Sequence, residues 1–411
     1  MQKKIVALAV AGLSTAAFAQ TNVTIYGVAD VSGQGFAMNK SKAGDYSSTS
    51  GQAASGNTFN LQSNSSLIGF KGTEDLGNGL KALFQAETTL ALTGGSAVAY
   101  GTSNNAFGAM RDSFVGLNSK YGTAMAGYLS TPLRATLVSF DVMPGATGSS
   151  QIDKIFGTVR FGERSLNGGN NSTAGQEYAA SIRATAIAYA MPTMYGFDAS
   201  IAYTGSNNNG RGNGTDSTGC SAGGSVSACS IAPQSAFGLN LGWTGYGVSI
   251  KGAFQQQGYN TINDDVNATA YTSYLVGASY TGIQNLKASV AYARNTLGVS
   301  GNSAVTADGA GKISNNQLYT GASYRMGNWE PRVSAVWSSD LNGTDAQQNG
   351  ARQWTANVGY YLSKRTQVYG LVSNLNNSAN QNYSFGQQSN NLKPTGGQNM
   401  FTYGMGMRTT F

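Results

Sequence analysis

The chain has 411 residues, of which 40% are hydrophobic, only 10% are charged and none is histidine. Without an imidazole base, Ser-His-Asp and Cys-His enzymes are excluded, and most zinc sites lose a usual ligand. The formal net charge of +7 is not clustered, so a nucleic-acid-binding surface is not indicated. We therefore predict no enzyme, no cofactor, no metal and no nucleic-acid partner, although lysine-based or two-carboxylate chemistry stays formally open.

The first segment has the pattern of a secretory signal peptide. Residues 3–4 are lysines, residues 5–13 are apolar, and residues 17–19 form the small-x-small cleavage site Ala-Phe-Ala. The apolar stretch is too short to span a membrane as a helix. We expect residues 1–19 to be removed on export and residues 20–411 to form one domain.

Beyond this segment, large apolar residues alternate with small or polar ones in short segments. A period of two is the pattern of strands with one apolar and one polar face. No apolar run reaches the roughly 18–20 residues of a membrane helix, which excludes a helical membrane protein. Sixteen segments show the alternation: 23–31, 66–76, 80–88, 111–119, 123–129, 178–191, 197–204, 236–243, 248–256, 271–280, 286–295, 317–326, 329–338, 353–362, 367–376 and 398–411.

Short turns, such as residues 77–79 and 192–196, alternate along the chain with long loops rich in Ser, Asn and Gly. An even number of strands with short turns at one end and long loops at the other is typical of outer-membrane barrels. At sixteen strands the interior is a channel and not a packed core. We predict an all-β fold, a 16-stranded antiparallel transmembrane β-barrel with short periplasmic turns.

The last segment ends at Phe411 and carries Tyr403, Met405 and Met407 on one face and Arg408 on the other. A soluble C-terminal strand would place the same apolar face in a core, so this segment alone leaves both readings open. Together with the fifteen other segments, lipid is the better partner for the apolar face. The arginine is then expected in the lumen, on the strand that closes the barrel against the first one.

Two cysteines, Cys220 and Cys229, lie in a stretch rich in Ser and Gly. An exported protein meets an oxidising compartment. We predict one disulfide at the tip of a long surface loop, which contributes at most about 2–3 kcal/mol by the chain-entropy estimate. Two unpaired cysteines that happen to be close in sequence are the alternative.

Four parts of the chain carry motifs: residues 23–30 (Val-Thr-Ile-Tyr-Gly-Val-Ala-Asp), the hairpin over residues 66–85, residues 361–366 (Tyr-Leu-Ser-Lys-Arg-Thr) and the terminal Phe411. Together they resemble the general porins of betaproteobacterial outer membranes. The first two resemble the family's first strand and second hairpin, and the third is similar to its most distinctive periplasmic turn. The terminal aromatic resembles the signal read by the barrel-assembly machinery.

The resemblance implies a cell-outer-membrane channel, usually a homotrimer, whose third external loop (130–177) folds inward to narrow the pore. Its implied partners are outer-membrane lipid and lipopolysaccharide, the barrel-assembly machinery, and the small hydrophilic solutes and ions that diffuse through it. A substrate-selective outer-membrane channel and a surface adhesin or receptor barrel are the alternatives, because long polar loops would suit either.

In this family the constriction places basic wall residues opposite acids on the third loop. Position by position, the resemblance implies that Arg111 is a retained constriction base. Lys71 and Lys81 lie on the strand faces expected to point inward. Leu67 and Tyr128 stand at pore-lining positions where arginine is common, so two positive charges are lost.

The resemblance places the opposing acids on the third loop, at Asp141, Asp153 and Glu163, and Asp30 of the first strand is expected to line the pore. Arg183 stays open, because its register is off by one and a one-residue slip reverses the face. An ordinary solvated position is the alternative for each of these charges. With fewer arginines on the wall, we expect a weak preference for anions.

Overall fold

The structure is a computed structural model that describes residues 22–39, 56–93, 107–143, 148–160, 177–205, 235–258, 267–300, 311–344, 347–385, 394 and 396–411. The predicted signal peptide, Glu163 and the two cysteines Cys220 and Cys229 lie outside these residues. Within the described ranges, no helix is long and apolar enough to cross a membrane.

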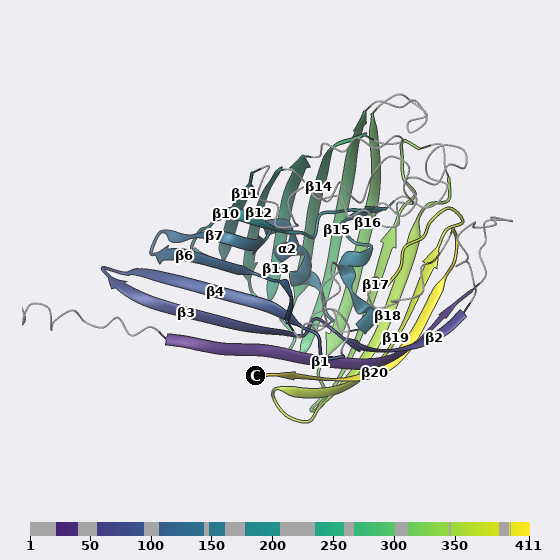
Figure 1. The fold of residues 1–411 in the computed structure, drawn as a ribbon, viewed down its shortest axis with the longest axis horizontal. Coiled ribbons are helices and arrows are strands. Elements are labelled where there is room, and N and C mark those ends of the chain that lie inside the picture. The colour runs from purple at the N-terminus through teal and green to yellow at the C-terminus, as the bar shows by residue number, and fades with distance from the viewer. Residues whose placement is uncertain are drawn as a thin grey trace, which may run out of the picture.

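Eighteen strand segments form one antiparallel sheet that closes on itself, because β1 pairs with β20 on one side and with β2 and β3 on the other (Figure 1). β2 and β3 follow one another along the same neighbour, and so do β5 and β6 along β4, which leaves sixteen strand positions. The predicted 16-stranded antiparallel barrel is confirmed. Its strands are β1 (Asn22–Met38), β2 (Gly56–Ser63), β3 (Leu67–Gly77), β4 (Leu80–Leu90), β5 (Phe107–Met110), β6 (Ser113–Ser119), β7 (Gly122–Ser130), β10 (Arg183–Ala190), β11 (Phe197–Thr204), β12 (Ser235–Gly245), β13 (Val248–Gly258), β14 (Asn267–Tyr280), β15 (Leu286–Ser300), β16 (Lys312–Tyr324), β17 (Trp329–Ser338), β18 (Ala351–Tyr361), β19 (Thr366–Asn377) and β20 (Met400–Thr410).

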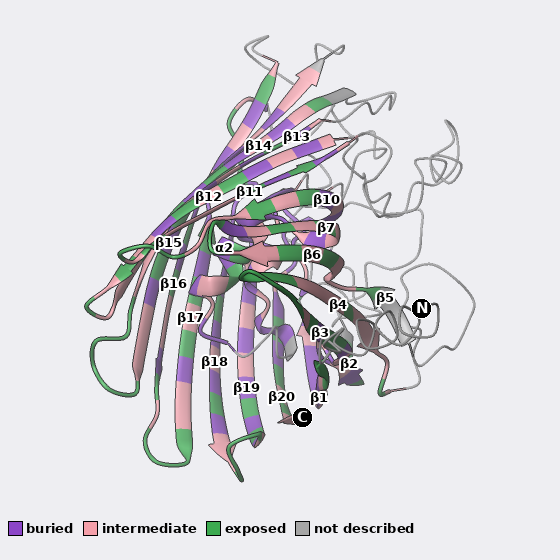
Figure 2. Cartoon of the chain, turned by 90° about the vertical axis from the view of Figure 1, so that its left-hand side faces the viewer, coloured by how far each residue is buried: buried purple, intermediate pink, exposed green. Residues whose placement is uncertain are grey.

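Side chains alternate between an apolar outer face and a more polar inner face, and exposed and buried positions follow one another along the strands (Figure 2). On β20, Tyr403, Met405 and Met407 are 61%, 75% and 49% exposed. Their neighbour Thr402 on the other face is fully buried. A barrel that presents such side chains outward is built to contact lipid, as the alternation predicts.

The barrel closes where the chain ends. The Gly27 N–H donates to the Phe411 carbonyl (3.0 Å), and the Phe411 N–H donates to the Gly27 carbonyl (3.1 Å). A Cβ atom at position 27 would lie 2.4 Å from the Phe411 ring and 2.6 Å from the Leu67 carbonyl oxygen. Only glycine therefore fits at this point of the seam, where the last strand meets the first as predicted.

The described parts of the connection between β7 and β10 lie inside the barrel. They contain α2 (Pro132–Phe140), the 3-10 turns η1 (Gly148–Ser150) and η2 (Ile152–Lys154), and the hairpin of β8 (Thr158–Arg160) and β9 (Glu177–Ala179). Thr131 caps α2, since its side chain accepts the Arg134 N–H, and Pro132 occupies the first turn. The helix packs against β11 to β15, within the ring of strands (Figure 1). The predicted inward fold of the third loop is confirmed.

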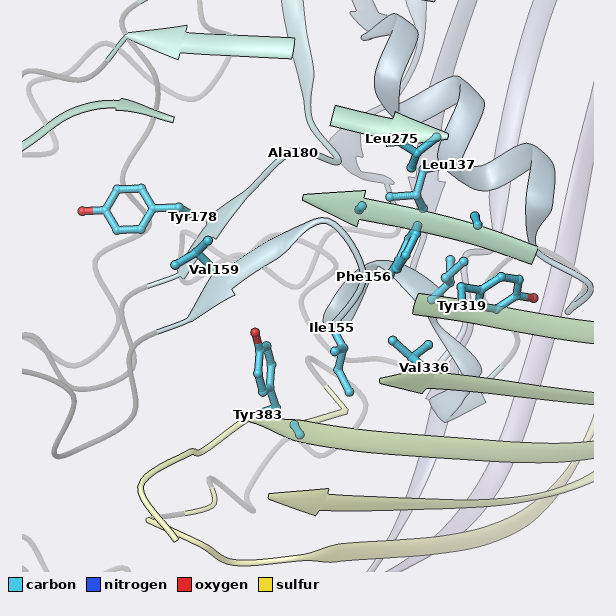
Figure 3. Packing of buried hydrophobic residues seen from close by; sticks show 14 of the residues in the cluster. Leu137, Ile155, Phe156, Val159, Tyr178, Ala180, Leu275, Tyr319, Val336 and Tyr383 are labelled. Atoms are coloured by element: carbon cyan, nitrogen blue, oxygen red, sulfur yellow. The ribbon is translucent and has the colours of Figure 1, made fainter. Parts of the chain in front are cut away.

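An apolar core fills the space between this loop and the barrel wall (Figure 3). Its members are almost or fully buried: Leu133, Leu137, Phe140, Ile155, Phe156 and Val159 of the loop, with Ala253, Leu275, Ala291, Tyr319 and Val336 of the wall. This part of the interior differs from the predicted water-filled channel. Apolar side chains on the inner wall are stable here because the loop removes them from water.

Candidate functional site

The inner face of β4 carries an acid, Glu87, that holds the predicted constriction base. The Tyr26 hydroxyl and the Gln85 side-chain amide donate to its Oε1 at 2.7 and 3.1 Å. The Arg111 Nε lies 3.5 Å from its Oε2, between β5 and β6, with the arginine side chain 20% exposed. Sequence reasoning missed Glu87 as a site residue, although it alternates with the inward Gln85.

Three other predicted site residues have the inward orientation expected of them. Lys71 pairs in register with Thr24 and Gln85, and its Nζ lies 5.0 Å from the centroid of the Tyr26 ring on the inner face. Lys81 lies on the same face of β4, beside the short turn to β3. Both lysines are exposed, and Leu67 shares their face at the other end of β3. Their part in a constriction stays a prediction.

The structure corrects the predicted position of Tyr128. On β7 it shares a face with the exposed Ala124 and Ala126, and Ala126 pairs in register with Ile187, which is 71% exposed. This is the outer face of the barrel, so the predicted pore-lining position is wrong. Arg183 pairs in register with Ser130 at the start of β10, and its Nε is 3.2 Å from Asp112 Oδ2.

Asp30 faces inward but is fully buried, so it does not lie open to a channel. Its Oδ1 accepts hydrogen bonds from the Tyr369 hydroxyl (2.6 Å) and the Asn64 side-chain amide (3.2 Å). Its Oδ2 accepts one from Arg408 Nη1 at 3.1 Å. Three segments far apart in the chain thus meet at this carboxylate, on the seam between β1 and β20.

The two described acids that were predicted as site residues on the third loop are also engaged. The Nη1 of Arg134, on α2, lies 3.1 Å from Asp153 Oδ2. The Ser181 hydroxyl donates to the same oxygen at 3.1 Å. Burial opposes ionisation of Asp153, but Arg134 and Lys154 outweigh it and hold the pKa of this carboxyl below its usual value.

Asp141 is turned to the barrel wall at the end of α2. Its Oδ1 accepts the Met143 N–H at 2.9 Å and the Tyr319 hydroxyl at 3.3 Å. Burial raises the pKa of Asp141 to about 7, against the opposing effect of Lys287. As placed here, this acid contacts the wall and not an open channel.

Basic side chains elsewhere on the inner wall also have acidic neighbours. Arg332 Nη2 lies 2.6 Å from Glu330 Oε2, and Lys251 Nζ lies 4.0 Å from Asp198 Oδ1. Together with the pairs at Glu87 and at Asp30, these contacts give the wall alternating signs instead of one row of bases. Sequence alternation places such residues on the inner face, but it does not show which of them are close enough to pair.

A family model described as Gram-negative porin matches residues 6–380. The chain belongs to the Gram-negative porin family. It is 30% identical over 382 residues to the outer membrane porin protein 32 of Delftia acidovorans, covering 92% of this chain and 90% of that relative. The resemblance to betaproteobacterial porins is therefore confirmed.

Solved structures share the fold. One described as an anion-selective porin from Comamonas acidovorans superimposes with a TM-score of 0.66 at 21% identity, covering 95% of this chain and 100% of that one. The trimer form of OmpT from Vibrio cholerae gives 0.58 at 13% identity, covering 95% and 99%. This Gram-negative porin is an outer-membrane channel, and its relatives are channel proteins.

Proposed function

We propose that this porin is a general diffusion channel for small hydrophilic solutes and ions, that its preference for anions is weak, and that it works as a homotrimer. The observation that carries the weak preference is the pairing of wall charges, with Arg111 next to Glu87 and Lys251 next to Asp198. A paired base and acid act on a passing ion mainly as a dipole, whose field falls off faster than that of a single charge.

The remaining preference for anions comes from the exposed Lys71 and Lys81 on the inner face of β3 and β4. Charged side chains that line a pore select ions by sign, and salt screens them over about 10 Å at 0.1 M ionic strength. The solved structure described as an anion-selective porin supports this sign, and the trimer form of OmpT supports the assembly. Export with loss of residues 1–19, recognition of Phe411 by the barrel-assembly machinery, and contact with lipopolysaccharide complete the proposal.

Replacing Arg111 with glutamate is expected to move the selectivity toward cations. The change reverses one charge beside Glu87 and places two acids where a pair stood. The reversal potential across a salt gradient in planar bilayers measures this change in selectivity. The shift in reversal potential should shrink at high salt. Lys120→Glu is the matched control, since Lys120 lies over the Tyr121 ring in the exposed turn between β6 and β7. Equal reversal potentials for Arg111→Glu and the wild type would remove Arg111 from the site.

The purified protein should insert into planar bilayers as a trimer of open channels. We expect conductance to rise in large steps, each of which resolves into three equal levels when channels close one at a time. Single-channel recording measures the conductance steps, and crosslinking of the detergent-solubilised protein measures the number of subunits. A bilayer that stays closed at all voltages contradicts the channel, while steps with one level contradict the trimer alone.

A further inference from the structure

The C-terminal end of α2 is held by a lysine of the barrel wall. Lys287 lies near the start of β15, on the inner face that it shares with Ser289 and Ala291. Its Nζ donates to the Asp141 carbonyl at 2.6 Å and to the Ser139 carbonyl at 3.2 Å. These two carbonyls belong to the last turn and the C-cap of the helix.

This contact satisfies groups that the helix cannot satisfy by itself. The last carbonyls of any α-helix lack partners within it, and the helix dipole makes this end negative. α2 has no basic residue in its last turn, so the positive charge comes from the wall. The apolar contacts of Leu137 and Phe140 attract the helix to the wall without fixing its direction, whereas a charged donor between two carbonyls fixes its end.

We propose that Lys287 is the residue that positions α2 in the lumen, and that it thereby sets the cross-section of the channel beside the third loop. It is a positioning residue, since it acts on permeation through the helix. The inference rests on the channel function, and a loosened helix should show as fluctuation of the open-channel current.

The neighbouring carboxyl provides a second way to observe the same contact. Three titratable or charged groups face the Asp141 side chain: Lys287 from β15, Tyr319 from β16 and Asp153 from the third loop. The Tyr319 hydroxyl also accepts the Val142 N–H at 3.1 Å. The C-terminal end of α2, Lys287 and Tyr319 therefore form one polar cluster next to the apolar core.

The direction of the pH effect follows from the raised pKa of Asp141. A released loop would expose this carboxyl to water, where its pKa is about 3.9, whereas in the docked loop burial raises it to about 7. The docked loop thus binds the proton more tightly, so docking is strongest below about pH 3.9 and weakens as pH rises through about 7. Without Lys287, which favours the carboxylate, the docked pKa of Asp141 would rise further and the weakening would continue to higher pH.

The test compares Lys287→Met, Lys287→Arg and the control Lys120→Met in planar bilayers between about pH 4 and about pH 9. Loss of a charged hydrogen bond should raise the population of undocked loop by about tenfold or more, seen as current noise and brief sublevels in Lys287→Met. Its noise should also go on rising to a higher pH than in the wild type, because the docked pKa of Asp141 is higher. Lys287→Arg keeps the charge and should restore most of the quiet current.

Asp141→Asn tests the pH effect separately, because its side chain does not titrate, and its noise should not depend on pH over this range. Equal noise and equal pH profiles in Lys287→Met and the wild type would overturn the inference. If Lys287→Met does not fold, Lys287→Gln takes its place, because it also removes the charge that binds the Asp141 and Ser139 carbonyls, and quiet current equal to the wild type then overturns the inference. A wild-type protein that never conducts would contradict the channel function itself.

Discussion

Replacing Gly27 with alanine is expected to lower the fraction of molecules in which the barrel closes. The new Cβ would lie 2.4 Å from the ring of Phe411 and 2.6 Å from the carbonyl oxygen of Leu67. The ring could turn aside, but the carbonyl belongs to the backbone of the neighbouring strand and could not. Overpacking of a tight site commonly costs 1–3 kcal/mol, and a clash with the sheet backbone places this one at about 3 kcal/mol or above.

Heat-modifiable migration in gel electrophoresis measures the folded fraction of the Gly27→Ala protein. Gly252→Ala is the matched control, because a Cβ atom there meets only the Leu275 carbonyl oxygen, at an ordinary contact distance of 3.7 Å. The control should fold like the wild type. Normal folding of both variants would show that the seam accommodates a Cβ atom at position 27 and would contradict the prediction.

The second large effect is expected at Asp30, which is fully buried while its partner Arg408 is 15% exposed. Removing the carboxylate in Asp30→Ala leaves the guanidinium without this acid and takes an acceptor from the Tyr369 hydroxyl. Breaking a buried ion pair from one side typically costs 3–5 kcal/mol. Urea unfolding of the barrel in lipid vesicles, followed by tryptophan fluorescence, measures the loss.

The comparison for Asp30 is a pair on the same inner surface that is more open to water. Asp198 and Lys251 are 30% and 25% exposed and lie 4.0 Å apart. Asp198→Asn should therefore cost less than about 1 kcal/mol. Equal losses of unfolding free energy for the two substitutions would mean that burial does not make the Asp30 ion pair more important for stability.

Alternation in the sequence predicted most of the barrel. The apolar sets on β12, β13 and β20 face outward as expected, because lipid on one side and polar groups on the other impose a period of two. At Tyr128 the alternation does not predict which face of the strand points outward. Ala124 and Ala126, which share its face, are too small to mark that face as the lipid side, and pairing with Ser113 decides the face.

The position of the third loop could not be predicted from alternation. Asp141 and Asp153 lie in a segment without a repeating pattern, and their partners Lys287 and Arg134 are distant in the chain or on the loop itself. Which carboxyl faces water and which faces the wall depends on how Leu137 and its apolar neighbours settle against the strands. This packing depends on the shapes of side chains that are distant in sequence, which a local sequence pattern does not predict.

The apolar core between loop and wall divides the inner surface of the barrel into two regions with different tolerance to change. Where α2 and its neighbours cover β13 to β17, the wall side chains are buried as in the interior of a soluble protein, and substitutions there act on folding. On β3 and β4 the inner side chains of Lys71, Thr73 and Lys81 are exposed. The solute path can thus diversify along one side of the lumen while the opposite side is constrained by its own packing.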